Sequence, residues 1–462
     1  MLSFFQNINN VLWNYFLIFI LFGTGIYLTC SFKFVQVRKF HYAIKKFFGN
    51  FSLKGKKANK RGMSSFQALA TAVASQIGAG NLGGAATAIV SGGPGAIFWM
   101  WVSGFFGMST IFSEATLAQI YKKDINGETV GGPSFYIEDG MKNKKLASFF
   151  AGAYLIFGIF DNMVQSNTAG KAISNSFHIP NLATGFIIAL LSAIVVMGGI
   201  SMLASVTEKL VPIMALGFSI GAFIIIFSNI PAVGRAFKSI FVCAFNAKAA
   251  AGGVIGYTVK QTIRYGVARG LYSNEAGMGT TPHAHAVAKV EHPAEQGLAA
   301  IVGLFIDTFV VLTLCALVIL SSGVSDGKIT GIELVQKAFC SHFGKSGSYF
   351  ITVSLFFFVY STIISIFFFT ESEFKYLFKG KNVKGKKHGL NIYRIIMLIF
   401  VTIAPCLDVP LVWEMTDTFN AVIIIPNIIA LICLVKVTKK SLYEYEDLIK
   451  QDYINNKIPV IK

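Results

Sequence analysis

The sequence predicts an all-α polytopic membrane protein that contains two five-helix units of opposite orientation. Three observations lead to this fold class. Several apolar segments approach the roughly 20 residues that span a bilayer core, the basic residues gather in the short connections, and two of the predicted helices are interrupted by glycine. One additional helix precedes the paired units, so we expect eleven membrane crossings in all.

The composition excludes a soluble globular protein. Of the 462 residues, 54% are hydrophobic and only 13% are charged, whereas soluble proteins carry about 25% charged residues. The apolar run over residues 13–30 has full spanning length and no early basic region, which indicates a retained helix rather than a signal peptide. No long polar linker divides the chain, and we expect one integrated membrane domain.

The net charge of +18 comes mainly from Lys and Arg in short loops, where it indicates membrane topology rather than nucleic-acid binding. Ten basic and no acidic residues lie between Lys33 and Arg61, which places this loop in the cytoplasm and the N-terminus outside. Contact of the same loop with anionic lipid is compatible with that placement. The six cysteines show neither a CxxC pair nor metal-ligand spacing, so we expect no disulfide or metal site.

Four parts are expected along the chain. They are an extra N-terminal transmembrane helix (1–32), a basic cytoplasmic loop (33–63), a ten-helix core (64–435) and a cytoplasmic tail (436–462). The core would consist of a first repeat (64–228) and a second repeat (229–435). The predicted core crossings lie at about 64–90, 95–120, 147–175, 182–200, 210–228, 235–272, 296–321, 347–369, 390–407 and 411–435. We expect a short segment with Glu208 and Lys209 between the fourth and fifth of these, and the C-terminus in the cytoplasm.

A glycine-rich sequence interrupts the first core helix. Residues 78–81 are Gly-Ala-Gly-Asn inside an apolar segment, although each glycine costs a helix roughly 1 kcal/mol relative to alanine. Unwound backbone at membrane depth is tolerated only where it lines a cavity or binds something. Free amides and the positive end of a half-helix suit a carboxylate. The residues expected to supply these groups to a substrate are Gly78, Ala79, Gly80 and Asn81.

A second glycine interruption is predicted at residues 251–256, in the sixth core helix. Because five is odd, the second unit enters the membrane in the inverted orientation. Interrupted helices at matching positions of two inverted halves indicate a binding site near the midplane. Carbonyls near Gly252 and Gly253 are expected to bind an ammonium group. The polar stretch 273–293 is expected to be an inner loop with a surface helix, and its three histidines lack the partners of a metal site.

Five short blocks of this chain resemble the alanine-or-glycine:cation symporter family. The blocks cover residues 92–102, 206–212, 266–277, 305–308 and 425–427, and they include Gly-Gly-Pro-Gly at 92–95 and Ser-Asn-Glu-Ala-Gly at 273–277. They extend across nearly all of the predicted core. The resemblance implies a leucine-transporter-like five-plus-five inverted repeat with one extra N-terminal helix. It also implies sodium-driven symport of a small neutral amino acid by alternating access. We expect no organic cofactor, and no obligate protein partner is evident in the sequence.

Sodium prefers a few hard oxygen ligands, and two adjacent hydroxyls offer them. Ser361 and Thr362 lie in a phenylalanine-rich predicted helix where little else is polar. By analogy with the leucine-transporter fold, they would bind sodium together with the carbonyls of Ala74 and Ile77. The alternative is that both hydroxyls bond to carbonyls one turn earlier in their own helix.

Polar residues of the third core helix are candidates for the substrate site. The amide oxygen of Gln165 is expected to bind the substrate ammonium group, and the family resemblance favours this role. The alternative for Gln165, Asn162 and Asn167 is hydrogen bonding between helices. Thr362 is expected to contact the substrate as well as sodium.

Carboxylates at membrane depth are costly and usually functional. Asp307 lies mid-helix in one of the blocks that the family shares, and it could face a cation or pair with a buried basic group. Asp161 shares a helix face with Gln165 at i, i+4, where family members usually carry a small or neutral residue. Both are candidates for a second cation or a proton. The alternative for Asp161 is surface exposure at a helix end. Glu114 and Glu208 lie near predicted cytoplasmic ends, where we expect a salt bridge at a gate or plain solvation.

Two departures from the family concern the side-chain pocket. Alanine transporters tend to carry an aromatic residue after the second glycine pair and a Trp four residues after the threonine. Here these positions are Val254 and Ile366. Both replacements free volume, so we expect the pocket to admit side chains larger than that of alanine, such as glutamine.

Two other classes of function are weaker. An ion channel would not need two interrupted helices in inverted halves. A membrane enzyme would need a catalytic constellation, and the zinc-protease motif HExxH does not occur on the predicted helices. Within the transporter class, proton coupling through Asp161 or Asp307 is the alternative to sodium.

Overall fold

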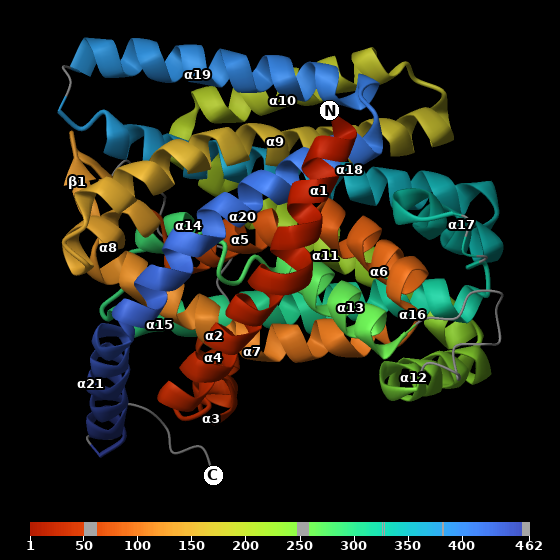
Figure 1. Cartoon of the computed structure of the whole chain (residues 1–462), viewed down its shortest axis with the longest axis horizontal. Helices are drawn as coiled ribbons and strands as arrows, with labels where there is room; N and C mark the ends of the chain where they lie inside the picture. Colours follow the sequence, from red (N-terminus) through yellow and green to blue (C-terminus); the bar gives the residue numbers. More distant parts are fainter. Residues whose placement is uncertain (50–61, 247–257, 326, 328, 381–382, 455–462) are drawn as a thin grey trace.

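The computed structural model describes residues 1–462 except 50–61, 247–257, 326, 328, 381–382 and 455–462. Long helices dominate, and most of them run along one common direction (Figure 1). The first half contains α1 (Leu2–Val11), η1 (Leu12–Phe16), α2 (Leu17–Ser31), α3 (Val35–Arg38), α4 (Phe40–Gly49), α5 (Ser65–Gln76), η2 (Gly80–Gly84), α6 (Ala85–Gly92), α7 (Ala96–Ile120), β1 (Lys123–Ile125), β2 (Glu128–Val130), α8 (Pro133–Gly140), α9 (Lys144–Phe177), α10 (Asn181–Met197) and α11 (Gly199–Ser228). The second half contains α12 (Ile230–Phe245), α13 (Val259–Asn274), α14 (Pro282–Ala286), α15 (Pro293–Leu304), η4 (Phe305–Leu312), α16 (Thr313–Ser322), α17 (Gly331–Phe343), α18 (Lys345–Leu377), α19 (Val383–Ile403), η5 (Ala404–Cys406), α20 (Val409–Cys433) and α21 (Val435–Ile454).

Within the described residues, seven helices are long and apolar enough to cross a membrane, and two shorter apolar helices accompany them. The outer faces of these helices carry the large apolar side chains expected of lipid contact. On α11, for example, Ile213, Leu216 and Ile220 recur at i, i+3 and i+7 with exposed fractions of 68%, 64% and 59%. The helix is continuous from Gly199, so the connection predicted around Glu208 and Lys209 is wrong. Apolar residues on both sides continue the helix, so Glu208 and Lys209 lie within α11.

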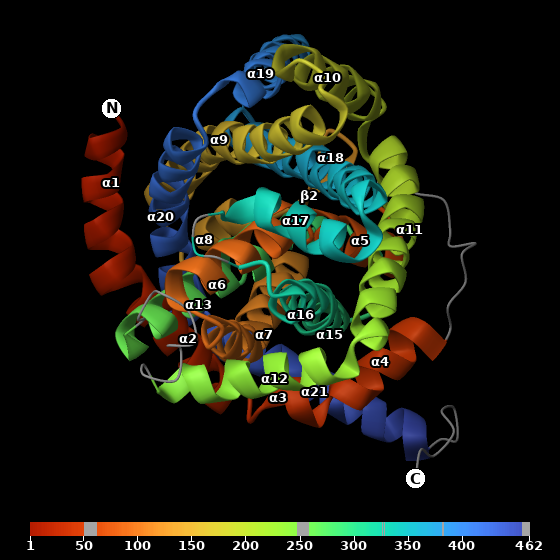
Figure 2. The same cartoon turned by 90° about the vertical axis from the view of Figure 1, so that its right-hand side faces the viewer.

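The N-terminal helix lies at the periphery of the core. α1, η1 and α2 follow one another without a loop, so the helix begins at Leu2, well before the apolar run at 13–30. It contacts α20 and α7, and Figure 2 shows it beside α20 at the edge of the molecule. Asn9 fixes this contact because its side-chain amide donates to the backbone carbonyl of Glu414 at 2.8 Å.

The first core helix is discontinuous, as the glycines predict. α5 begins with a capping box in which Ser64 and Gln67 each accept a hydrogen bond from the other residue's backbone amide, at 3.1 and 3.0 Å. The helix ends at Gln76, because Ile77 has a ψ of 87°. A π-helical turn, η2, then leads into α6. We call residues 77–79 the first break.

The sixth core helix differs from its prediction. Residues 251–256, including Gly252, Gly253 and Val254, lie outside the described residues. Among the described residues, α13 ends at Asn274 and an irregular segment, 275–281, separates it from the short helix α14. We call residues 275–281 the second irregular segment. It is buried, and so are His283 and His285, so the prediction of a surface-exposed inner loop is wrong.

The two ends of the helical core are covered differently. A two-stranded hairpin, β1–β2, and α8 lie at one end, and α12 and α17 lie across the other (Figures 1 and 2). In the middle, α9 packs against α18 and α20, and α5 packs against α11, α15 and α18. The first break is therefore enclosed by helices from both halves of the chain.

Candidate functional site

The first break and the second irregular segment lie side by side in the interior. The side-chain amide of Gln76 donates to the carbonyl of Asn274 at 2.8 Å, and the hydroxyl of Ser75 donates to the carboxylate of Glu275 at 3.1 Å. These residues are nearly 200 positions apart in the sequence. All of them are buried. The structure thus brings two irregular backbone segments together at one place, where polar backbone groups are available to a ligand.

Two helices point a polar side chain at the first break. Gln165 of α9 accepts a hydrogen bond from the amide of Ala79 at 3.0 Å through Oε1. Thr362 of α18 approaches from the other side: a Cβ atom built on Gly78 would lie 2.7 Å from Thr362 Oγ1 and 2.9 Å from Gln165 Oε1. Only glycine fits at this position. Gly78, Gln165 and Thr362 therefore form the centre of the candidate site.

The adjacent hydroxyls of α18 converge on the end of α5. Thr362 Oγ1 lies 3.0 Å and Ser361 Oγ 3.3 Å from the carbonyl oxygen of Ala74. Both hydroxyls also lie within hydrogen-bond distance of the carbonyl of Phe358 in their own helix. The sequence left two interpretations of these hydroxyls, sodium binding and hydrogen bonding within their own helix. The geometry allows both, because each hydroxyl lies close to the carbonyl of Phe358 and to that of Ala74, a predicted sodium ligand. Ile77, the second predicted carbonyl, is the residue at which α5 unwinds.

A second oxygen-rich cluster lies on the other side of the first break. Asp307, in the π-helical segment η4, accepts a hydrogen bond from the side-chain amide of Asn81 at 2.5 Å. Its other carboxylate oxygen accepts from the hydroxyl of Thr308 at 2.8 Å, and the hydroxyl of Ser273 lies 3.5 Å away. Asp307 is fully buried and has no ion-pair partner among the described residues. The cluster combines a carboxylate, an amide and two hydroxyls, which suits a hard cation or a proton.

Asp161 lies beside the site and faces an aromatic residue that the sequence analysis did not single out. Its carboxylate accepts a hydrogen bond from the hydroxyl of Tyr272 at 3.2 Å, and only 4% of Asp161 is exposed. The predicted alternative of surface exposure at a helix end is therefore wrong. The Tyr272 ring packs on Trp413 and lies against Gly80 of η2.

Ile366 lies one helical turn beyond Thr362, on the same face of α18. It is buried and faces Gly158 of α9, where an added Cβ would lie 3.5 Å from Ile366 Cγ2. Gly158 and Asp161 are in turn nearly one turn apart on α9. The same Cβ would overlap Thr370 Cγ2, so α9 and α18 are closely packed at Gly158.

The remaining polar residues of the third core helix have different roles. Asn167 donates to the carbonyls of Ala404 and Leu407 at 2.7 and 3.0 Å, which is the hydrogen bonding between helices that was the alternative interpretation. Asn162 is fully buried, and its side-chain amide has no hydrogen-bond partner in the described part of the chain.

Of the two acidic residues near predicted cytoplasmic ends, Glu114 departs from its predicted surroundings. Glu114 is fully buried and accepts hydrogen bonds from the backbone amides of Gly277 and Gly279, at 3.2 and 2.9 Å, and from Asn427 at 2.6 Å. It holds the second irregular segment, so the prediction of a gate salt bridge or solvation is wrong for this residue. Glu208 accepts a hydrogen bond from the side chain of Gln67 at 2.8 Å.

Glu275 is the main residue of this region that the sequence analysis missed. It is 6% exposed and accepts hydrogen bonds from Ser75 at 3.1 Å and Thr280 at 2.5 Å. The only feature of the sequence that pointed to Glu275 was its place in the block at 266–277, which resembles the symporter family. The predicted inner-loop position gave no reason to expect a buried carboxylate there.

The three histidines of the predicted inner loop, residues 273–293, each contact a different partner. His283 lies 2.8 Å from Glu373, His285 lies 2.8 Å from Gln296, and His292 accepts a hydrogen bond from Ala294 at the start of α15. Over the ranges that the structure describes, no group of three or more His, Cys, Asp or Glu side chains could hold a metal ion.

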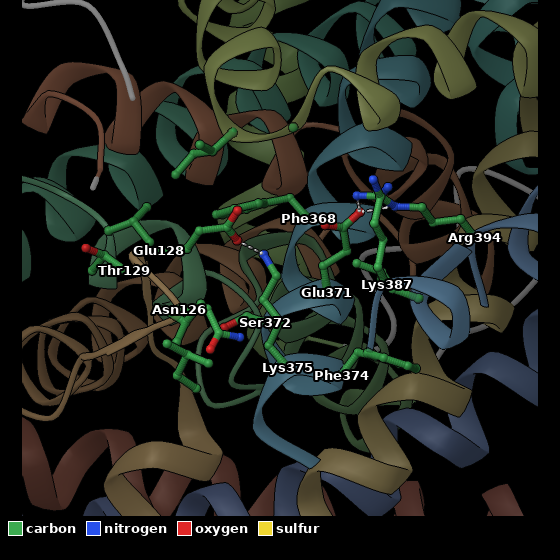
Figure 3. Close-up of a pocket in the computed structure, with 16 residues that line it drawn as sticks. Asn126, Glu128, Thr129, Phe368, Glu371, Ser372, Phe374, Lys375, Lys387 and Arg394 are labelled. Atoms are coloured by element: carbon green, nitrogen blue, oxygen red, sulfur yellow. Dashed lines mark hydrogen bonds and ion pairs between the residues drawn. The ribbon is translucent and has the colours of Figure 1, made fainter. Parts of the chain in front are cut away.

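Two of the cavities among the described residues lie toward opposite ends of the core. The first has a volume of about 410 Å³ and lies between the β1–β2 hairpin, the end of α18 and the start of α19. Figure 3 shows its paired charges, Lys375 with Glu128 and Arg394 with Glu371. The second, of about 430 Å³, lies between α1, α13 and α20 and ends at Tyr272. The site itself is closed to both, because Gln165 is 4% exposed and Thr362 is fully buried.

Comparison with known proteins gives a match over almost the whole chain. The family model described as the sodium:alanine symporter family matches residues 1–458. The sodium/alanine symporter AgcS of Methanococcus maripaludis is 37% identical over 98% of this chain and 99% of its own length. The probable sodium/glutamine symporter GlnT of Bacillus subtilis is 37% identical over 95% of this chain and 89% of its own.

Two solved structures share the fold at low sequence identity. MhsT in complex with L-phenylalanine superposes with a TM-score of 0.58 at 13% identity, covering 84% of this chain and 99% of its own. A manganese transporter of Eremococcus coleocola superposes with a TM-score of 0.57 at 14% identity, covering 79% of this chain and 78% of its own. These likenesses confirm the predicted fold class, a leucine-transporter-like membrane protein.

Proposed function

The chain belongs to the sodium:alanine symporter family, and we propose that it carries a small neutral amino acid across the membrane together with sodium by alternating access. The observation that carries this proposal is the meeting of Gln165 and Thr362 at the unwound Gly78. A substrate that is both a cation and an anion needs amides for its carboxylate and oxygens for its ammonium group. The first break and the side chain of Gln165 offer both kinds of group within one buried volume.

In this proposal the carboxylate of the amino acid binds the backbone amides of residues 78–81. Glycine at position 78 allows close approach, because no Cβ lies between the backbone and the ligand. The ammonium group binds Gln165 Oε1, which would exchange its hydrogen bond with Ala79 for one with the substrate. Gly252, Gly253 and Val254 lie outside the described residues, so the proposal uses none of their contacts.

Sodium binds between α5 and α18 in this proposal. Its ligands are the hydroxyls of Ser361 and Thr362 and the carbonyls of Ala74 and Ile77. The convergence of both hydroxyls on the Ala74 carbonyl supports this assignment. Because Thr362 lies close to both Gly78 and Ala74, sodium and substrate would stabilise each other's sites.

The aliphatic side chain of Ile366, where alanine transporters tend to carry a Trp, supports a substrate side chain larger than a methyl group. Relatives of this chain include proteins named for alanine and for glutamine. We propose that both amino acids are accepted, with the side chain directed toward Ile366.

A proton is the second candidate for the coupling ion. It is favoured by one observation: Asp161 and Asp307 are buried carboxylates without an ion-pair partner among the described groups. A buried carboxylate of this kind requires a bound cation or a proton. Asp307, with its amide and hydroxyl neighbours, is the better candidate for a second cation, and Asp161 for a proton.

We place the protein in the plasma membrane with its N-terminus outside and its C-terminus in the cytoplasm. The charge distribution supports this orientation, because the β1–β2 hairpin, the end of α18 and the start of α19 carry many basic residues. The cavity at α13 and α20 would then open to the outside and the cavity at the hairpin to the cytoplasm.

Uptake into proteoliposomes tests the proposal. Radiolabelled alanine and glutamine would be supplied with an inward sodium gradient, and separately with a proton gradient alone. We expect accumulation that requires sodium and that is lost in Gln165→Ala and Thr362→Ala. Accumulation driven by protons alone would transfer the coupling role to Asp161 or Asp307, and no accumulation under either gradient would refute an alanine or glutamine symporter.

A further inference from the structure

The cavity beside the β1–β2 hairpin is lined by charged and by apolar side chains (Figure 3). Its longer walls are one face of α18 and one face of α19, because the lining residues of each helix recur at i, i+3 and i+7. These residues are Phe368, Glu371 and Lys375 on α18 and Lys387, Leu390 and Arg394 on α19. The hairpin closes a third side with Asn126 and Glu128. The volume of about 410 Å³ is within the range of small-molecule sites, roughly 300–1,000 Å³.

Two cations of this cavity keep unused donors although each has an acidic partner. Arg394 directs Nε and Nη2 to one oxygen of Glu371, both at 2.6 Å. The described partner of its Nη1 is the side chain of Asn391, at the long distance of 3.5 Å. The ammonium group of Lys375 lies 2.7 Å from Glu128, and its other N–H groups have no partner in the described part of the chain. Both side chains can therefore donate to a further anionic oxygen without leaving their ion pairs.

The charge of the cavity suits an anion with a single negative charge. Lys387 is exposed and has no ion-pair partner within the described ranges. The cations Lys375, Lys387 and Arg394 face the carboxylates Glu128 and Glu371, so one positive charge is not neutralised. A phosphate monoester carries about −1.5 to −2 charges at neutral pH, whereas a phosphate diester carries a single negative charge. Of the two, the diester matches the charge of this cavity.

A narrow apolar crevice adjoins the cavity. The two share Gly199, Phe368 and Glu371. The other residues that line the crevice are all apolar: Val195, Val196, Leu203 and Ile364. The junction is open, because an added Cβ at Gly199 would meet no atom within 4 Å. On either side of Val195 and Val196 in the sequence, Ile194 and Met197 are 55% and 80% exposed, as expected of lipid contact. A molecule held in the cavity can thus extend an apolar chain along the crevice to the lipid-facing surface.

We propose that the cavity beside the hairpin binds the headgroup of an anionic phospholipid, whose phosphate is a diester and whose acyl chain lies along the crevice. Arg394 Nη1, Lys375 and Lys387 donate to the phosphate oxygens. Basic pockets between helices at the membrane surface suit such headgroups. The bound lipid would link the hairpin to α18 and α19. This site is independent of the proposed substrate and coupling ion, because none of its residues belongs to the central site.

Lipid binding to the purified full chain in detergent tests this proposal. Native mass spectrometry would follow titration with phosphatidylglycerol, and separately with phosphatidylcholine, which has the same acyl chains and a zwitterionic headgroup. We expect phosphatidylglycerol to bind at least about tenfold more tightly. Lys387→Gln should weaken its binding about fivefold, because one basic contact to the headgroup is lost. Inorganic phosphate at millimolar concentration should not displace the lipid.

The matched control is Lys144→Gln. Lys144 is an exposed lysine at the start of α9, shortly after α8 at the same end of the core, and it is not among the residues that line the cavity. This variant should bind phosphatidylglycerol like the wild type, and Lys387→Arg should keep most of the affinity because it keeps the charge.

Three results would overturn the proposal. Equal affinity for phosphatidylcholine would mean ordinary contact with surrounding lipid. Wild-type binding by Lys387→Gln, or an equal loss in Lys144→Gln, would mean that the cavity does not select the headgroup. Displacement of the lipid by inorganic phosphate would mean a site for free anions.

Discussion

Replacing Gly78 by alanine is the sharpest test of the central site. The new Cβ would lie 2.7 Å from Thr362 Oγ1 and 2.9 Å from Gln165 Oε1, whereas ordinary contacts of this kind are about 3.5 Å or longer. Neither oxygen can move freely, because Thr362 is hydrogen bonded to Ala74 and Gln165 to Ala79. Overpacking of a close-packed interior costs about 1–3 kcal/mol.

This free energy should appear in transport, because the displaced atoms are those proposed to bind substrate and sodium. A loss of 1–3 kcal/mol in binding corresponds to a fall in affinity of roughly 5- to 150-fold. The assay is the initial rate of sodium-driven alanine uptake in proteoliposomes at a series of alanine and sodium concentrations. We expect both apparent affinities to fall in Gly78→Ala.

Gly84 provides the control, because it belongs to the same discontinuous helix and an added Cβ would meet no atom within 4 Å. Gly84→Ala should therefore transport like the wild type. The reasoning is refuted if Gly78→Ala keeps wild-type affinities for alanine and sodium. It is equally refuted if Gly84→Ala is impaired to the same extent, since the effect would then come from the helix rather than from the site.

Four other substitutions have definite expected outcomes. Thr362→Ala should lower the apparent sodium affinity at least tenfold while Thr362→Ser keeps most of it, as measured by the sodium dependence of uptake; equal losses would contradict the hydroxyl's role. Asp307→Asn should lower the Hill coefficient for sodium, because it removes the carboxylate proposed to hold a second cation, and an unchanged coefficient argues against that role. Ile366→Trp should reduce glutamine uptake much more than alanine uptake, because the substrate side chain is proposed to point toward residue 366 and a larger ring there leaves it less room, and a parallel loss of both would contradict a side-chain pocket. Glu114→Gln should lower the melting temperature, because loss of the charge weakens hydrogen bonds worth about 1.5–3 kcal/mol each when one partner is charged, and an unchanged melting temperature would contradict this structural role.

The sequence alone was sufficient for the membrane class and the first break. Both follow from local properties of the chain, whereas the roles of Gln165 and Thr362 stay predictions for two side chains that the structure places beside Gly78. Spanning length, the position of charges and the helix-breaking effect of Gly78 and Gly80 act on a segment whatever its tertiary neighbours are. The five blocks that resemble the symporter family then added an expectation of function, and the family match over residues 1–458 confirms that membership.

Only the tertiary structure decided which distant groups meet. It brought Ser75 and Glu275 within 3.1 Å of each other and Tyr272 within 3.2 Å of Asp161. It also showed that the second irregular segment, which was predicted to lie at the surface, is buried. There Glu114 accepts hydrogen bonds from the amides of Gly277 and Gly279. The physical reason is that a polar segment can be solvated by water or by buried partners elsewhere in the chain. The composition of a segment shows that its polar groups need hydrogen-bond partners. Which residues become those partners depends on how the helices pack.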